Sequence, residues 1–83
     1  MCDLKQLIID LQSKNCDFEI KIYCDSENFK DMILKKINNS KIYGINVKSF
    51  NNRIISISNY YQVNKDYLEY KLSISLLSNE IML

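Results

Sequence analysis

The strongest constraint on the fold of this chain is a strict alternation of apolar and polar side chains between residues 67 and 77. The side chains at even positions are Leu68, Tyr70, Leu72, Ile74 and Leu76. Those at the odd positions between them are Tyr67, Glu69, Lys71, Ser73 and Ser75. A period of two places one set on a buried face of a β-strand and the other set on a face in water. The segment therefore predicts a strand over Tyr67–Leu77 with one buried face.

Two further strands are predicted before this one, over Ile42–Ser49 and Arg53–Tyr61. Facing residues of an antiparallel pair share a face, so the parity of each loop decides which side chains are buried together. A three-residue loop at 50–52, with Asn52 in the left-handed conformation, and a two-residue loop at Asn64-Lys65 both give one common buried face. The residues on that face are Tyr43, Ile45, Val47, Ile55, Ile57, Leu72 and Ile74. The sequence therefore predicts a three-stranded antiparallel meander.

The first part of the chain predicts a helix followed by a strand. Asp3 can accept a hydrogen bond from the amide of Gln6, whose side chain can reach back as in a capping box, and Asn15 can end the helix. The apolar stripe of this helix is Leu4, Leu7, Ile8 and Leu11. The strand has its inward side chains at Phe18, Ile20, Ile22 and Cys24.

A second helix is predicted after this strand, with Asp25 or Ser26 as its N-cap. Its inner stripe is Phe29, Met32, Ile33 and Ile37, and its side in water carries Lys30, Asp31 and Lys35. Gly44 then falls inside the next predicted strand, where a glycine marks a bulge, a close backbone approach or an ordinary irregularity.

These elements predict an α+β fold with the order α-β-α-β-β-β in a single small domain over residues 1–83. A right-handed crossover through the second helix makes the first two strands parallel, and both helices then cover one face of a four-stranded, mainly antiparallel sheet. We expect the strand order 1-2-3-4; the alternative places the first strand at the far edge, beside the fourth. At the centre of the core we expect Leu7, Ile20, Ile33, Ile57 and Leu72.

The charge balance and the cysteine usage limit the compartment and the partners. The formal net charge of +1 gives no strong global attraction to nucleic acid or membrane. No apolar run reaches the about 18 residues of a membrane span, and the first residues lack the pattern of a signal peptide. Cys2, Cys16 and Cys24 cannot all pair within one chain, and they share no metal-type spacing. We therefore expect a cytoplasmic protein with free thiols.

Residue types on which enzymes depend are missing. The chain has no His, the commonest general base near neutral pH, and Gly44 is its single glycine, so no glycine-rich loop can bind a phosphate. Cys24, beside Asp25-Ser26 at a helix start, is the one candidate nucleophile, but its inward position in the alternation favours a buried structural thiol. We expect no catalytic residue, no metal and no cofactor.

The candidate binding residues are aromatic side chains at outward strand positions. Tyr23, Tyr60 and Tyr67 occupy such positions, and Phe50 and Arg53 adjoin them at the predicted hairpin. The basic residues that accompany them are Lys21, Lys48 and Lys71. Such a face can contact a protein, where Tyr and Arg are enriched, or stack single-stranded bases; tyrosines are also good strand formers that need no ligand. We expect a protein-binding surface of these five residues, with homodimerisation as a further use and nucleic-acid binding as the alternative.

The opening of the chain, from Asp3-Leu4 through Ser13-Lys14-Asn15 and into the alternation from Phe18, resembles the start of small phage-encoded anti-CRISPR proteins that inhibit Cas9. Those proteins have a similar length, begin with a short Asp-Leu helix and continue into a sheet. The resemblance implies an inhibitor that binds a bacterial defence complex. The abundance of Ile, Asn, Lys and Tyr suits an AT-rich genome, such as that of a low-GC bacterium or its phage. The balanced charge differs from that of the acidic, DNA-mimicking members.

Overall fold

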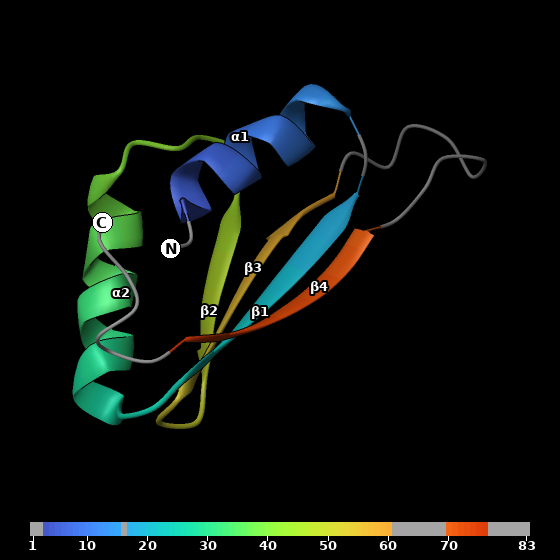
Figure 1. Cartoon of the computed structure of the whole chain (residues 1–83). Helices are drawn as coiled ribbons and strands as arrows, with labels where there is room; N and C mark the ends of the chain where they lie inside the picture. Colours follow the sequence, from blue (N-terminus) through green and yellow to red (C-terminus); the bar gives the residue numbers. More distant parts are fainter. Residues whose placement is uncertain (1–2, 16, 61–69, 77–83) are drawn as a thin grey trace.

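The computed structural model describes residues 3–15, 17–60 and 70–76, and these ranges form two helices and four strands. The elements are α1 (Leu4–Ser13), β1 (Phe18–Cys24), α2 (Glu27–Asn39), β2 (Asn46–Phe50), β3 (Ile54–Asn59) and β4 (Tyr70–Leu76). Both helices lie on the same side of the sheet (Figure 1). The predicted α+β class and the order of the elements are confirmed.

The strands lie in the order β2-β3-β1-β4, so the expected order 1-2-3-4 is wrong. The alternative is wrong too: β1 does pair with β4, but it lies inside the sheet and not at its edge. Loop parity shows which side chains share a face, and it does not show which strands are neighbours. Ile20 faces both Ile57 and Leu72, so inserting β1 between β3 and β4 leaves the predicted buried face intact.

The directions of the strands follow from three pairings. β3 is antiparallel to both β1 and β2, and β4 is parallel to β1. β1 and β2 therefore run in the same direction, as the crossover through α2 predicts, but β3 lies between them in a split β-α-β arrangement. Two of the three pairings are antiparallel, as expected for a mainly antiparallel sheet.

The hairpin between β2 and β3 has the predicted three-residue length but lies one residue later than expected. Phe50 pairs with Ile54, which leaves residues 51–53 as the loop. Asn51, at φ 46°, takes the left-handed conformation expected of Asn52. Its side-chain Oδ1 also accepts a hydrogen bond of 2.8 Å from the Arg53 amide, which closes the turn. The predicted turn at Asn64-Lys65 lies outside the described residues.

The segment before β2 differs from the prediction, because the strand begins at Asn46 and not at Ile42. Gly44 has φ +83°, a conformation that interrupts a strand, and it lies in the connecting loop. Tyr43, which was expected to be buried, is 83% exposed. The loop is held to α1 by its backbone, since Gln12 Nε2 donates a 2.7 Å hydrogen bond to the Tyr43 carbonyl.

The helix caps follow the sequence in part. Asp3 Oδ1 accepts from the Gln6 amide at 3.0 Å, as predicted, and Ser26 caps α2 through the Phe29 amide at 3.2 Å. The capping box is wrong, because the Gln6 side chain donates to Asp10 one turn further on. Asn15 takes a left-handed φ of 53° just after the helix, in agreement with its predicted role as a stop.

The inner side of α2 is rotated relative to the predicted stripe. Phe29, Ile33 and Ile37 are buried, but Met32 is 41% exposed and Lys30, expected in water, is 8% exposed. Successive residues of a helix are about 100° apart around its axis. The middle of the arc formed by the three buried residues is therefore closer to the direction of residue 30 than to that of residue 32. The Lys30 ammonium contacts the exposed Asp31 carboxylate at 2.7 Å, so its stem is buried while its charge is paired.

The hydrophobic core lies between the helices and the inner face of the central strands. Its fully buried large side chains are Phe18, Leu4, Ile8, Ile20, Ile22, Ile33, Ile55 and Ile57. The predictions for Ile20, Ile33 and Ile57 are confirmed. Those for Leu7 and Leu72 are wrong, because both side chains are only half-buried. Leu72 lies on β4, which is at the edge of the described sheet and has one neighbouring strand, β1, among the described strands.

Candidate functional site

The outer face of the sheet carries an apolar row at its hairpin end. Phe50 on β2 faces Ile54 on β3, and Ile54 faces Tyr23 on β1. Because neighbouring strands are about 4.8 Å apart, these three side chains lie side by side across three strands. Phe50 is 48% exposed, Tyr23 is 39% exposed and Ile54 is half-buried between them. We call Phe50, Ile54 and Tyr23 the hairpin row.

A second row lies next to the hairpin row on the same face. It joins Lys48, Ser56 and Lys21, which face one another across β2, β3 and β1. We call these three residues the lysine row. Ser56 is buried even though it points away from the core, because longer side chains flank it on both sides. Two residues along a strand span about 7 Å, so the lysines lie within reach of whatever contacts the hairpin row.

The third row of this face contains its one acidic side chain among the described strand residues. Glu19 faces Ser58 on one side and Lys71 on the other. The lysine row separates Glu19 from the hairpin row, and Lys71 lies beside Glu19 in register. Among the described strand residues, the charges nearest the hairpin row on this face are therefore positive.

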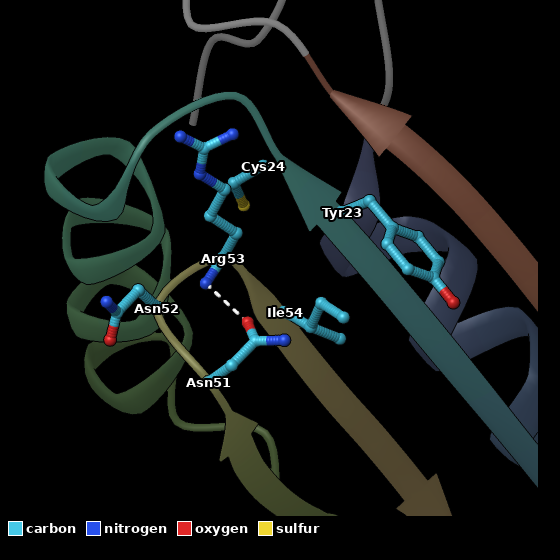
Figure 2. A pocket seen from close by; sticks show the side chains of 6 residues that line it. All are labelled: Tyr23, Cys24, Asn51, Asn52, Arg53 and Ile54. Atoms are coloured by element: carbon cyan, nitrogen blue, oxygen red, sulfur yellow. Dashed lines mark hydrogen bonds between the residues drawn. The ribbon is translucent and has the colours of Figure 1, made fainter.

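An open pocket of about 430 Å³ lies where the hairpin turn meets the end of β1 (Figure 2). It is lined by Tyr23, Cys24, Asn51, Asn52, Arg53 and Ile54. The Cys24 amide donates a 2.8 Å hydrogen bond to the Arg53 carbonyl, which fixes the turn against β1. The Arg53 side chain extends past Cys24, whereas the Tyr23 hydroxyl points away from it (Figure 2). No described carboxylate forms a salt bridge with Arg53.

Cys24 contributes an apolar surface to this pocket and no reactive group. Burial raises the pKa of its thiol, the neighbouring Asp25 charge raises it further, and Lys30 opposes both effects. The thiol is thus protonated at neutral pH, which makes it a poor nucleophile. The described residues contain no group of three or more His, Cys, Asp or Glu side chains placed to hold a metal ion. None of the described helices has the length and apolar character needed to span a bilayer.

The structure brings together three of the five predicted binding residues. Tyr23 and Phe50 share the hairpin row, and Arg53 adjoins Ile54, the centre of that row, in the turn. Tyr60, which is 45% exposed, follows the last residue of β3 and so lies at the opposite end of that strand. Six residues of strand span about 20 Å, which separates Tyr60 from this row. Tyr67 lies outside the described residues.

Sequence reasoning missed Ile54, which joins Tyr23 to Phe50. The signal was present in the run Ile54-Ile55, since two adjacent apolar residues in a strand must point to opposite faces. With Ile55 directed into the core, Ile54 had to lie on the outer face.

No protein-family model, curated protein or solved structure matches this chain.

Proposed function

We propose that this chain is a non-enzymatic interaction protein that binds a protein partner through the hairpin row and Arg53. The observation that carries the proposal is the strand register, which places two exposed aromatic rings on either side of Ile54. An arginine adjoins them at the pocket. Tyr and Arg around an apolar centre are the residue types that dominate the binding energy of protein interfaces.

The hairpin row is not needed to bury the core. The inner face of the same strands already supplies five fully buried large side chains, on the side that the helices cover. A contiguous exposed apolar row has a cost in water unless another molecule covers it, which favours a role in binding. Tyr43 differs in this respect, because it is a single exposed side chain in a loop and serves as a matched control.

The lysine row favours nucleic acid as the second candidate, since lysines beside exposed rings can hold phosphates while bases stack. Ile54 argues for the protein partner, because the centre of the row is aliphatic and offers no ring on which a base can stack. The net charge of +1 also gives little of the long-range attraction typical of nucleic-acid-binding domains.

The direct test is photo-cross-linking with a photoreactive phenylalanine analogue at position 50 or, as the control, at position 43. In lysate of a low-GC bacterium, we expect a discrete protein adduct from position 50 that unlabelled parent protein competes away, and no such adduct from position 43. Adducts of equal yield from both positions, or an adduct made only of nucleic acid, would contradict the proposal.

The first partner to test is a CRISPR effector complex, which the resemblance of the opening segment suggests. We propose that the protein inhibits such a complex by occupying a working surface. DNA cleavage by a purified Cas9-type ribonucleoprotein should fall when the parent protein is added and should recover with the Tyr23→Ala/Phe50→Ala variant. Sedimentation of the protein alone tests whether the same row instead joins two copies of the chain.

A further inference from the structure

The strand and turn residues on either side of the hairpin row include three cations. Lys21 and Lys48 lie on one side of it and Arg53 on the other, and none of the three forms a salt bridge within the described ranges. Glu19 is farther away, beside Lys71. Asp25 follows the end of β1, and its charge acts on the Cys24 thiol. An apolar row between cations is complementary to an apolar group between carboxylates.

Two side chains that line the pocket, Asn51 and Arg53, offer hydrogen-bond donors to a ligand. Asn51 uses its Oδ1 to accept from the Arg53 amide, so its side-chain nitrogen is the group left to bind a ligand. That nitrogen is on the Ile54 side of the turn (Figure 2). Arg53 adds a guanidinium, which has donors only and matches a carboxylate in a paired, two-bond geometry. These donors beside Ile54 and Cys24 favour a ligand that has hydrogen-bond acceptors next to an apolar group.

The spacing along the strands sets the form of that ligand. Arg53, the hairpin row and the lysine row follow one another along the direction of β3. The hairpin and lysine rows are two residues apart, about 7 Å, which is also the distance between alternate side chains on one face of an extended peptide. Arg53 is one residue from Ile54 and is hydrogen-bonded to Cys24 across the turn, and its side chain lines the same pocket as Tyr23 and Ile54. An extended segment can thus place alternate side chains on the hairpin and lysine rows, and a further side chain can meet Arg53 at the pocket.

We propose, on the basis of the proposed function, that the partner presents an extended acidic segment. On the face of this segment that contacts the sheet, alternate residues are acidic, apolar and acidic. The apolar side chain packs on Ile54 between Tyr23 and Phe50. One carboxylate binds Arg53, and the other lies between Lys21 and Lys48. Nucleic acid, which shares only the negative charge, is an outcome of the test and is not part of the proposal.

The probe is a short synthetic peptide with the sequence glutamate, serine, phenylalanine, serine, glutamate, capped at both ends. Amide chemical shifts of the full chain are followed by NMR as millimolar peptide is added at low salt. Matched peptides carry glutamine or lysine in place of both glutamates, and a short oligothymidylate tests the nucleic-acid outcome.

We expect the acidic peptide to shift the resonances of Tyr23, Ile54 and Arg53, with affinity falling at least about tenfold for the glutamine peptide. Arg53→Gln and the double variant Lys21→Gln/Lys48→Gln should each weaken binding by about tenfold, whereas Lys35→Gln on α2 removes the same kind of charge elsewhere and should leave it unchanged.

Equal binding of the lysine peptide, tighter binding of the oligothymidylate or an equal effect of Lys35→Gln would overturn the inference. If no peptide shifts these resonances while the position-50 adduct still forms, the acidic segment is wrong and the proposed function stands. If the adduct is also absent, both fail.

Discussion

The two faces of one sheet differ in what holds their side chains in place. On the face that the helices cover, Ile20, Ile22 and Ile55 are 0% exposed. On the other face, and only one residue along the strands, Tyr23 is 39% and Phe50 is 48% exposed. Packing against the helices fixes the first set, and the second set has large apolar surfaces that the core does not use. The difference indicates that stability and binding can be changed separately in this chain, and mutations at adjacent positions can test it.

The largest effect is expected at the centre of the inner face. Ile20→Ala removes methyl and methylene groups from a fully buried site and leaves a cavity, so we expect a loss of about 2–5 kcal/mol in the free energy of unfolding. Lys21→Ala, one residue on and on the outer face, should cost less than about 0.5 kcal/mol. Urea unfolding of both variants measures the contrast, and similar losses would show that the faces do not differ as described.

A smaller loss is expected at the edge of the inner face. Leu72 shares the row of Ile20 and Ile57 but is half-buried, so Leu72→Ala should cost about 1–2 kcal/mol. The relevant measurement is the difference between Leu72→Ala and Ile20→Ala under the same unfolding conditions. A loss for Leu72→Ala as large as that for Ile20→Ala would mean that burial does not decrease toward β4.

Gly44 tests a contribution to stability that comes from neither face. A Cβ there would meet Asn59 and Gln12 side-chain atoms at an ordinary 3.7 Å, so the strain comes from the backbone φ of +83°. Gly44→Ala should therefore cost about 1 kcal/mol in thermal or urea unfolding. Lys41, a non-glycine residue at φ 59°, is the matched control: Lys41→Gly should leave stability unchanged or raise it slightly. Losses in both variants would contradict this account.

The smallest effect concerns Cys24, the last inner residue of β1, which lies next to the outer Tyr23. Burial raises the pKa of its thiol, and Asp25 adds to the shift. The unfolded chain then releases this proton at a lower pH than the folded chain does. The protonated Cys24 thiol therefore contributes its full share of the free energy of unfolding below the ordinary thiol pKa, and this contribution is lost as the pH rises through the raised pKa. Replacing the thiol removes this pH dependence.

For Cys24 the measurement compares the parent with Cys24→Ala by urea unfolding at neutral and at alkaline pH. Cys2 and Cys16 are present in both proteins, so their titration cancels. We expect the difference in free energy of unfolding to narrow as the pH rises. If the difference in free energy of unfolding between the two proteins did not change with pH, Cys24 would be exposed to water and would not belong to the inner face.

The fold could be predicted from the sequence wherever the local alternation of apolar and polar residues determines the structure. The alternation from Phe18 to Cys24 gave the bounds of β1, and the parity of the hairpin loop gave the shared face of Val47 and Ile57. The order of the strands could not be predicted in the same way. It depends on which strand gains most from two neighbours and full helix cover, and that is a property of the assembled core. Tyr43 shows the other limit, because the backbone of Gly44 ended an alternation that continued in the sequence.

The candidate site was predictable in its residue types and less so in its arrangement. Outward alternation identified Tyr23, and the loop length placed Phe50 and Arg53 near the hairpin. That Tyr23 and Phe50 belong to one row depends on β3 pairing with both β1 and β2, which local patterns do not reveal. The same pairing places Tyr60 at the other end of the face. The assignment of Tyr60 as a binding residue stays a prediction without support from this arrangement.

We propose that the hairpin row binds a partner and is not required for folding. The decisive measurement is the affinity for the cross-linked partner of the parent, Tyr23→Ala/Phe50→Ala and Tyr43→Ala, each with its unfolding free energy. We expect the double variant to lose at least about 30-fold in affinity, or about 2 kcal/mol, while its stability falls by less than about 1 kcal/mol. Tyr43→Ala should match the parent in both. Equal affinity of the double variant and the parent, with both folded, would contradict the claim.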